Sequence, residues 1–472
     1  MHVPGVRSLW KGLLVTLLLT NRANAIDLDV TDQDSLKNAA STSVYAMMTY
    51  YHGNETGQIP GAFPTKWWEG AALFLALLHY WHFTGDTTYN DELSVGLEWQ
   101  AGECDYMPSN YSAYLGNDDQ MFWGLAAMTA AEIQFPDSTV GEGYSWLSLA
   151  QGVFNTQIAR WDTTKCGGGL RWQIWSWESG YTMKNAISNG GLFQLSARLY
   201  RYTGSETYGN WARKIWDWSV SSPLVSNSTW NVADSTEMTN DCTTQGNTQW
   251  SYNYGTYLIG ASYMYNSPLE TANPIALYQT NGTEQATWKT AVSGLLNQTL
   301  DKFAPASNGG ILEEIVCEPS EVCNNNEVLF KGLVSGWLSF TALVAPFTFD
   351  TILPKLQTSA QAAAKSCTGH NNNTCGVRWY QSNYDGWIGM EEQISATNIF
   401  VANLINFETS APVTSTTGGN STGNPTAGTN DTHSSTDNLP TITTADKAGA
   451  GILAVVFVIG WVGLMGWTVM GG

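Results

Sequence analysis

Apolar residues recur at intervals of three and four positions in about a dozen segments, and clusters of glycine, asparagine and proline separate these segments. This spacing gathers apolar side chains on one face of a helix. No long linker or abrupt change of composition interrupts residues 26–408, which indicates one large domain. The pattern predicts helices at residues 32–51, 66–83, 87–101, 117–134, 144–160, 184–202, 206–221, 246–265, 284–301, 329–345, 349–365 and 392–406.

An internal similarity indicates how these helices pair. Residues 83–89 resemble residues 202–208, and each stretch follows an apolar helix and opens a more polar one. Gly85 and Gly204 favour a helix end at each place. Six such hairpins predict an all-α fold, a toroid with an inner and an outer ring of helices. The more apolar helices, expected in the inner ring, include those near residues 66–70, 117–134, 184–191 and 250–255.

The two ends of the chain carry targeting patterns. Residues 1–25 combine basic residues, an apolar core and an A-x-A cleavage site, which predicts a signal peptide. Residues 409–434, rich in serine and threonine, predict a stalk. Residues 435–472 end in an apolar run that no basic residue follows, which favours the propeptide of a GPI anchor attached at Ser434. A single membrane span is the alternative. Either arrangement predicts a secreted domain, held at the outer face of the plasma membrane or in the cell wall.

Cysteines and sequons agree with secretion. The close spacing of Cys317 with Cys323, and of Cys367 with Cys375, predicts two local disulfides. The other three cysteines predict one further pair and one free thiol. No pattern of cysteines or histidines indicates zinc, and we expect neither a metal nor an organic cofactor. Sequons occur at Asn54, Asn110, Asn227, Asn281, Asn297, Asn372, Asn420 and Asn430.

The charge and the aromatic content narrow the classes of partner. The formal net charge is −20, and loss of the three basic residues of the signal peptide would make it −23, which would repel nucleic acid and anionic lipid. Only 13% of the residues are charged, whereas 22 are tryptophan and 21 are tyrosine. Flat rings with polar edges suit stacking on sugars as well as core packing. We therefore expect most of these rings in the core and the rest in a groove that binds carbohydrate. We also expect a monomer.

The candidate chemistry is a pair of adjacent acids, Asp118 and Asp119. They follow a Gly-Asn turn and precede an apolar run, which predicts a helix from about Asn117 with both acids in its first turn. Cleavage of a glycosidic bond uses two carboxyl groups. The alternative is that both acids merely cap the helix. A second pair, Glu391 and Glu392, begins the last predicted helix, where capping or a substrate contact is favoured over catalysis.

If the inner helices begin on one face, their first residues form a groove around the acid pair. The side chains in it would stack on sugars or bind their hydroxyl groups. Some of the tryptophans would instead belong to the core, and a structural ion pair is an equal alternative for the lysine. The candidate substrate-binding residues are Trp67, Trp68, Asn117, Gln120, Trp123, Trp172, Lys184, Asn185, Asn189, Tyr252 and Asn253.

Four segments, at residues 116–120, 167–173, 184–190 and 250–255, resemble glycoside hydrolase family 76. These α-1,6-mannanase-like proteins have an (α/α)6 barrel, and the ends of this chain resemble those of the family's fungal cell-wall branch. The resemblance covers nearly all of the predicted domain. It departs from the expected pattern at Val232–Ser235, where relatives are expected to have an Asp-Gly pair.

The resemblance implies a retaining mechanism in which Asp118 is the nucleophile and Asp119 the general acid/base. Neighbouring helical residues diverge by about 100°, so both acids serve one sugar only if the helix start is distorted or the bond is approached end-on. The expected reaction is cleavage within the GPI core glycan of lipid-anchored wall proteins, with transfer of the fragment to wall β-glucan. The alternatives are hydrolysis of α-1,6-mannan and a catalytically silent, mannan-binding wall protein.

Overall fold

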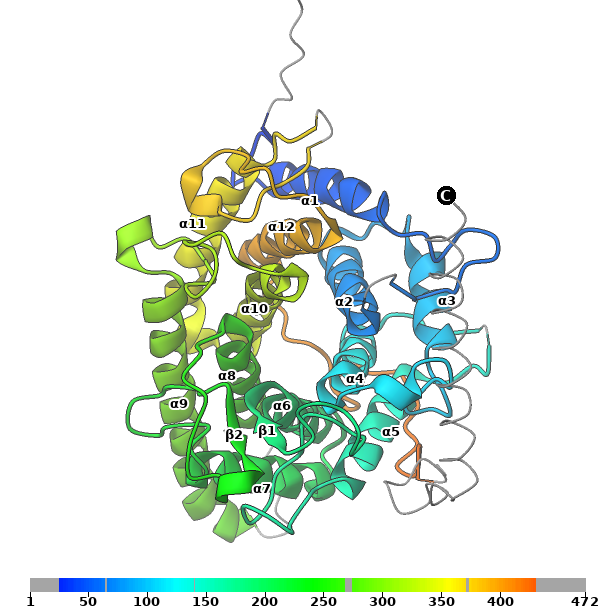
Figure 1. Cartoon of the computed structure of the whole chain (residues 1–472), viewed down its shortest axis with the longest axis vertical. Coiled ribbons are helices and arrows are strands. Elements are labelled where there is room, and N and C mark those ends of the chain that lie inside the picture. The colour runs from blue at the N-terminus through cyan, green and yellow to red at the C-terminus, as the bar shows by residue number, and fades with distance from the viewer. Residues whose placement is uncertain (1–24, 64–65, 140, 268–273, 371–372, 430–472) are drawn as a thin grey trace, which may run out of the picture.

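The computed structural model describes residues 25–63, 66–139, 141–267, 274–370 and 373–429, and this part of the chain contains twelve α-helices. They form two concentric rings, an (α/α)6 barrel, as the pattern predicts (Figure 1). The helices are α1 (Gln33–Met48), α2 (Trp67–Thr84), α3 (Asn90–Trp99), α4 (Asn117–Glu132), α5 (Trp146–Ala159), α6 (Ala186–Thr203), α7 (Glu206–Ser221), α8 (Ser251–Asn266), α9 (Pro274–Phe303), α10 (Asn325–Val344), α11 (Phe349–Ser366) and α12 (Met390–Ala402).

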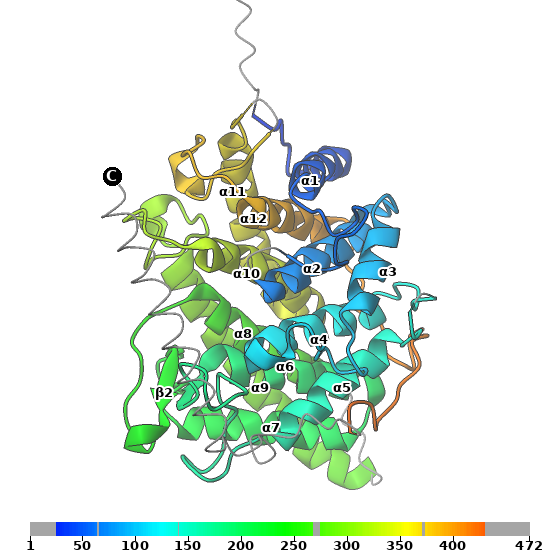
Figure 2. The same cartoon turned by 45° about the vertical axis from the view of Figure 1, so that its right-hand side comes forward.

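The even-numbered helices make the inner ring, which closes because α12 packs against α2, and the odd-numbered helices cover it (Figures 1 and 2). Inner helices are buried along nearly their whole length, whereas outer helices such as α7 bury one face. Backbones approach closely within the inner ring: a Cβ atom at Gly332 of α10 would lie 2.5 Å from Ser395 Cα of α12. Helix α10 is apolar and long enough to cross a membrane, but it is almost wholly buried in this ring.

Two predicted helices begin later than expected because a small two-stranded sheet takes up the segments before them. Strand β1 (Met183–Asn185) pairs antiparallel with β2 (Ser235–Glu237), so α6 starts at Ala186 and not at residue 184. Gly246 donates its N–H to the Ser235 carbonyl at 2.8 Å, so the segment before α8 also runs beside β2. The two-stranded sheet therefore places the start of β2 at the N-terminal end of α6.

The disulfides follow the expected pairing. Cys317 is bonded to Cys323 and Cys367 to Cys375, which confirms both predicted local bridges. A third bridge joins Cys166 to Cys242, and Cys104 is a buried free thiol. All three bridges lie in loops between helices.

The predicted features that fall outside the described residues are most of the signal peptide, Ser434 with the segment after it, and the sequon residues Asn372 and Asn430. The side chain of Asn281 is likewise not described. The other sequon asparagines have exposed side chains, as the attachment of a glycan requires: Asn54, Asn110, Asn227, Asn297 and Asn420.

Residues 413–429, which we name the C-terminal strap, bind along the barrel. The strap begins at the C-terminal ends of the inner helices. There the Val413 N–H donates to the Glu132 carbonyl, and the Ser415 N–H donates to the Tyr202 carbonyl, each at 2.9 Å.

The strap then follows α5. The Leu147 N–H donates to Ser421 Oγ at 3.0 Å near the start of that helix. Near its end, Asn155 Nδ2 donates to the carbonyls of Pro425 and Ala427 at 3.0 and 2.8 Å. The strap thus runs from one end of the barrel wall toward the other.

This binding differs from the stalk predicted at residues 409–434, because residues 413–427 are bonded to the barrel. Serine, threonine and glycine suggest a solvated tether by composition alone. The same residue types also bond readily to a neighbouring surface through their backbones and hydroxyl groups. The partners of the strap lie more than 200 residues away in sequence, so no local pattern reveals them.

We expect the strap to stabilise the barrel. A chain ending at Glu408 should melt about 5 °C or more below a chain ending at Thr429, because buried carbonyls and the Leu147 N–H lose their partners. Circular dichroism melting of the two chains measures this difference. Equal melting temperatures would show that the strap rests on the surface without stabilising it.

Candidate active site

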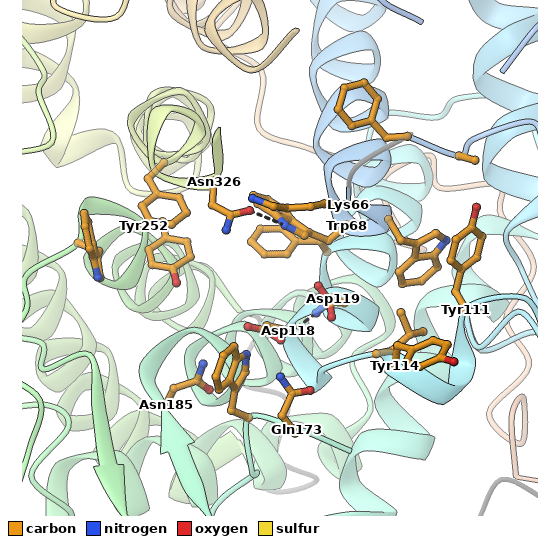
Figure 3. A pocket seen from close by; sticks show the side chains of 18 of the residues that line it. Lys66, Trp68, Tyr111, Tyr114, Asp118, Asp119, Gln173, Asn185, Tyr252 and Asn326 are labelled. Atoms are coloured by element: carbon orange, nitrogen blue, oxygen red, sulfur yellow. Dashed lines mark hydrogen bonds between the residues drawn. The ribbon is translucent and has the colours of Figure 1, made fainter. Parts of the chain in front are cut away.

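The N-terminal ends of five inner helices surround a cavity of about 850 Å³. Helices α2, α4, α6, α8 and α10 each contribute a residue at or near their first turn, whereas α12 contributes none to its lining. Figure 3 shows these side chains converging on Asp118 and Asp119. The expected convergence of the helix starts on one face therefore exists.

Asp118 and Asp119 occupy the first turn of α4, which begins at Asn117 as predicted. The Gly116 N–H donates to Asp119 Oδ2 at 2.7 Å, and the Asp119 N–H donates to Asp118 Oδ1 at 3.1 Å. A Cβ atom at Gly116 would overlap Asp118 Oδ1 and lie 3.2 Å from Asp119 Oδ2. The two oxygens therefore flank one point and are less than about 6 Å apart. Both carboxyl groups fold back over the turn, so they do not diverge as free side chains on a helix would.

The electrostatics of this pair favour retention of a proton. Burial raises the pKa of Asp118 well above its usual range, and the neighbouring Asp119 charge adds to the effect. Burial also raises the pKa of Asp119 to about 6, although the bond from the Gly116 N–H opposes that rise. A hydrogen bond from the Trp172 side chain lowers the pKa of Asp118. Such a pair can donate one proton while carrying one negative charge.

Five of the predicted contact residues line the cavity. Trp68 donates its indole N–H to Asn326 Oδ1 at 3.2 Å, and the Tyr252 ring stacks on Phe330 with centroids 3.7 Å apart. These contacts fix two flat walls above the acids (Figure 3). The predicted residues in the lining are Trp67, Trp68, Trp172, Asn185 and Tyr252.

The sequence profile of Glycosyl hydrolase family 76 matches residues 35–416. The chain belongs to this family. It is 42% identical over 465 residues to the mannan endo-1,6-alpha-mannosidase DCW1 of Saccharomyces cerevisiae, an alignment that covers 97% of this chain and 98% of that protein. Sequence and fold therefore agree on the family.

Two solved structures are similar. Dfg5 from Chaetomium thermophilum, in complex with glucosamine, has a TM-score of 0.78 and 38% identity, with 85% of this chain and 97% of that chain covered. The GH76A alpha-1,6-mannanase from Salegentibacter sp. HEL1_6 has a TM-score of 0.60 at 18% identity, with 78% and 99% covered. At that identity the likeness of the second structure concerns the fold alone.

The other six predicted contact residues of this family 76 chain do not line the cavity. Asn117 accepts a hydrogen bond from Arg160 Nε at 2.8 Å, and Gln120 donates to the Asp105 carbonyl at 2.7 Å. Trp123 is fully buried and stacks behind Trp67. Their side chains support the wall from behind. The six residues are Asn117, Gln120, Trp123, Lys184, Asn189 and Asn253.

Lys184 is a structural residue in this geometry, which is the alternative left open by the sequence. Its buried ammonium group donates to the carbonyls of Asp162, Lys165 and Gly168, and it lies 3.4 Å from Asp162 Oδ2. Burial lowers the pKa of Lys184 to about 8. The lysine thereby holds the loop that leads into Trp172.

Asn189 and Asn253 hold residues near the cavity. Asn189 accepts from the Leu170 N–H at 2.7 Å and donates to the Leu170 carbonyl at 2.9 Å. Asn253 Nδ2 donates to Asp234 Oδ1 at 3.0 Å. Asp234 itself lines the cavity, and burial raises its pKa. Each asparagine thus positions a neighbouring loop.

Sequence reasoning missed Asp234 and several other lining residues. The pairing of β1 with β2 places Asp234, whose carbonyl accepts the Ala186 N–H at 2.7 Å, and this long-range pairing has no local signal. The departure from the family's expected Asp-Gly pair at Val232–Ser235 was a hint that this loop matters for the site. The remaining missed residues that matter for the wall are Lys66, Tyr111, Tyr114, Phe122, Gln173, Asn326 and Phe330.

The second acid pair is buried at the start of α12, outside the cavity lining. Glu391 accepts a hydrogen bond from Asn325 Nδ2 at 2.7 Å, which ties α12 to the start of α10. Burial raises the pKa of Glu392 to about 7.

In the described part of the chain, a further acid, Glu327, lies beside Cys317 and Cys323, but their disulfide leaves no thiolate to bind a metal.

We expect Gly116→Ala to disable the site while leaving the fold intact. The backbone at Gly116 is extended, so alanine fits its φ and ψ, but the new methyl group would displace Asp118 Oδ1. A displacement of about 1 Å should lower kcat on a mannan oligosaccharide about 100-fold. Gly209→Ala on the outer helix α7 is the matched control, expected to keep wild-type activity. Unchanged activity in Gly116→Ala would contradict the crowding of the acids over this residue.

Proposed function

We propose that the protein is a retaining glycosidase that acts on α-1,6-linked mannosides. The observation that carries this proposal is that Asp118 Oδ1 and Asp119 Oδ2 lie on either side of one point over Gly116, at most about 5.5 Å apart, in a cavity lined by aromatic rings. Retaining glycosidases hold their two carboxyl groups about 5–5.5 Å apart, whereas inverting enzymes need about 6.5–9.5 Å. Family membership and the names of the fungal relatives support the α-1,6-mannoside specificity.

In the first step, a carboxylate oxygen of Asp118 attacks the anomeric carbon of a mannosyl unit. The bond between that carbon and the glycosidic oxygen breaks, and the Asp119 proton passes to the departing oxygen. The product is a mannosyl ester of Asp118. In the second step, Asp119 takes the proton of an incoming hydroxyl group, whose oxygen bonds to the anomeric carbon as the ester bond breaks. Water in this role gives hydrolysis, and a sugar hydroxyl gives transfer.

The lining supports a neutral or amine-bearing sugar as the donor. Asp118, Asp119 and Asp234 give the cavity wall acidic groups, and Lys66 is its one lysine or arginine among the described residues. An anionic ligand would be repelled by the unprotonated acids. The Chaetomium thermophilum relative holds glucosamine, an amino sugar. This chemistry supports our more specific proposal that the donor is a GPI core glycan, in which α-linked mannose joins glucosamine.

We further propose that the product is transferred to wall β-glucan. The protein would be secreted through a signal peptide at residues 1–25 and anchored by GPI at Ser434, on the outer face of the plasma membrane or in the cell wall. This location would hold a monomeric enzyme next to lipid-anchored donors. Hydrolysis of α-1,6-mannan is the second candidate, since water enters the same second step. The intact acid pair counts against a catalytically silent binding protein.

We expect the two acids to separate by function, and their shared proton to set the pH dependence. Burial raises the pKa of both carboxyl groups, so the pair keeps one proton between them after the first has been lost. The value of kcat/KM should therefore fall when the pH rises far enough to remove this last proton, which the leaving group needs. On an aryl mannoside, whose leaving group needs little proton donation, Asp119→Asn should still form the mannosyl ester, whereas Asp118→Asn should form none.

Mass spectrometry of the protein after a 2-fluoro-mannosyl donor detects this ester, and NMR of early products detects retention of configuration. On natural linkages each variant should lose about 100-fold or more in kcat. An inverted product, or an ester formed on a residue other than Asp118, would overturn the mechanism.

The transfer proposal has its own test. Incubation of the wild-type protein with a GPI core glycan donor and a β-1,3-glucan oligosaccharide should yield a product whose mass is the sum of the donor fragment and the acceptor. The same donor without glucan should give only slow hydrolysis. If mannan is cleaved equally well with and without glucan and no joined product forms, simple hydrolysis is the function.

A further inference from the structure

Four aromatic rings, two of them exposed, lie at one side of the cavity and beside it. Tyr111 precedes the short helix η1 (Ser112–Tyr114) and Tyr114 ends it; both line the cavity, and Tyr114 is 73% exposed. Beside them, Trp175 and Trp177 stack face to face, with centroids 5.1 Å apart and planes 8° from parallel. Trp177 is 48% exposed. We name Tyr111, Tyr114, Trp175 and Trp177 the aromatic ramp.

The ramp is joined to the cavity. The Trp175 indole N–H donates to the Ser112 carbonyl at 2.5 Å, so its loop is fastened to the helical turn that carries Tyr114. The same loop begins with Trp172 and Gln173, which line the cavity. Single exposed aromatic residues are common and need no explanation. A stacked pair with one exposed ring, fastened beside a ligand cavity, is typical of a binding surface.

The two acids distinguish the two sides of the cavity. Asp118, the proposed nucleophile, accepts a hydrogen bond from Trp172. Burial raises the pKa of Tyr252, and the charges of Asp234 and then of Asp118 add to that rise, so Asp118 faces the wall formed by Trp172 and Tyr252. Asp119, the proposed acid/base, is held by the Gly116 N–H, close to η1. Figure 3 shows Tyr111 and Tyr114 on the Asp119 side, with Tyr252 and Asn185 on the Asp118 side. The leaving group, and later the acceptor, occupies the side of the acid/base.

We propose that the aromatic ramp is the acceptor site and that it binds a linear glucan chain. This inference rests on the proposed transferase function. A hydroxyl oxygen of the bound chain would attack the anomeric carbon of the Asp118 mannosyl ester, its proton would pass to Asp119, and the ester bond would break. The ramp would raise the local concentration of this hydroxyl above that of competing water. The uncharged rings suit a neutral polysaccharide, which offers apolar ring faces for stacking.

The first measurement is binding of a linear β-1,3-glucan hexasaccharide, without donor, by calorimetry and by tryptophan fluorescence. Trp177→Ala and Tyr114→Ala should each raise the Kd about tenfold, and the wild-type emission should shift to the blue as Trp177 is covered. Trp99→Ala and Tyr45→Ala are matched controls. These residues are 41% and 71% exposed, lie on the outer helices α3 and α1, and do not line the cavity.

The second measurement is partition of the mannosyl ester between glucan and water. Trp177→Ala should lower the ratio of transfer to hydrolysis about tenfold while total donor consumption stays within twofold of wild type. A merely structural role would instead lower donor consumption. Transfer by Trp99→Ala should match wild type.

The outcomes separate this inference from the proposed function. Weaker glucan binding in the ramp variants alone supports the ramp, even if the wild type only hydrolyses its donor, a result that would count against the transferase function. A wild type that does not bind the hexasaccharide would overturn the ramp. So would ramp variants that bind and transfer like the two controls.

Discussion

Enclosure of the inner helices determines where this fold can hold polar and charged groups. Each inner helix is surrounded by two ring neighbours and an outer helix, so polar groups along its length would be buried without water. Only the ends are open. At the N-terminal ends, backbone N–H groups without a partner inside the helix donate hydrogen bonds to anionic side chains. The Gly116 N–H donates to Asp119 in this way. The fold thus places carboxyl groups at the mouth of the ring, where chemistry can use them.

A second layer of buried polar groups keeps that mouth in shape. Glu314 caps the start of α8 by accepting hydrogen bonds from the backbone N–H and the hydroxyl of Ser251, and burial raises the pKa of Glu314 to about 8. Nearby, Lys331 pairs with Glu318 at 2.8 Å. Together with the contacts of Lys184, these groups support lining residues from behind without entering the cavity. Because each bond is enclosed, the loss of one partner should disturb the wall that it holds.

The helices, the rings and the acid pair could be predicted from the sequence because each depends on a local or periodic pattern. The start of α4 at Asn117 follows from a turn and an apolar run in one short segment. Residues placed by long-range pairing could not be predicted. Asp234 lies at the cavity because it directly precedes the three-residue strand β2. Lys184 points away from the cavity because it belongs to the paired strand β1 and bonds the loop behind it. A sequence indicates that a lysine is polar, but not to which face the strand turns it.

The C-terminal strap changes where the chain leaves the barrel. The polypeptide emerges from the ring at the C-terminal ends of the inner helices, opposite Asp118 and Asp119. The strap returns it along α5 to Asn155, one helical turn from Arg160, the residue that contacts Asn117 beside those acids. Seventeen residues that could span about 60 Å as a free tether are committed to this path. The strap at Ala427 therefore lies toward the end of the barrel that holds Asp118 and Asp119, and not at the end where the polypeptide leaves the ring.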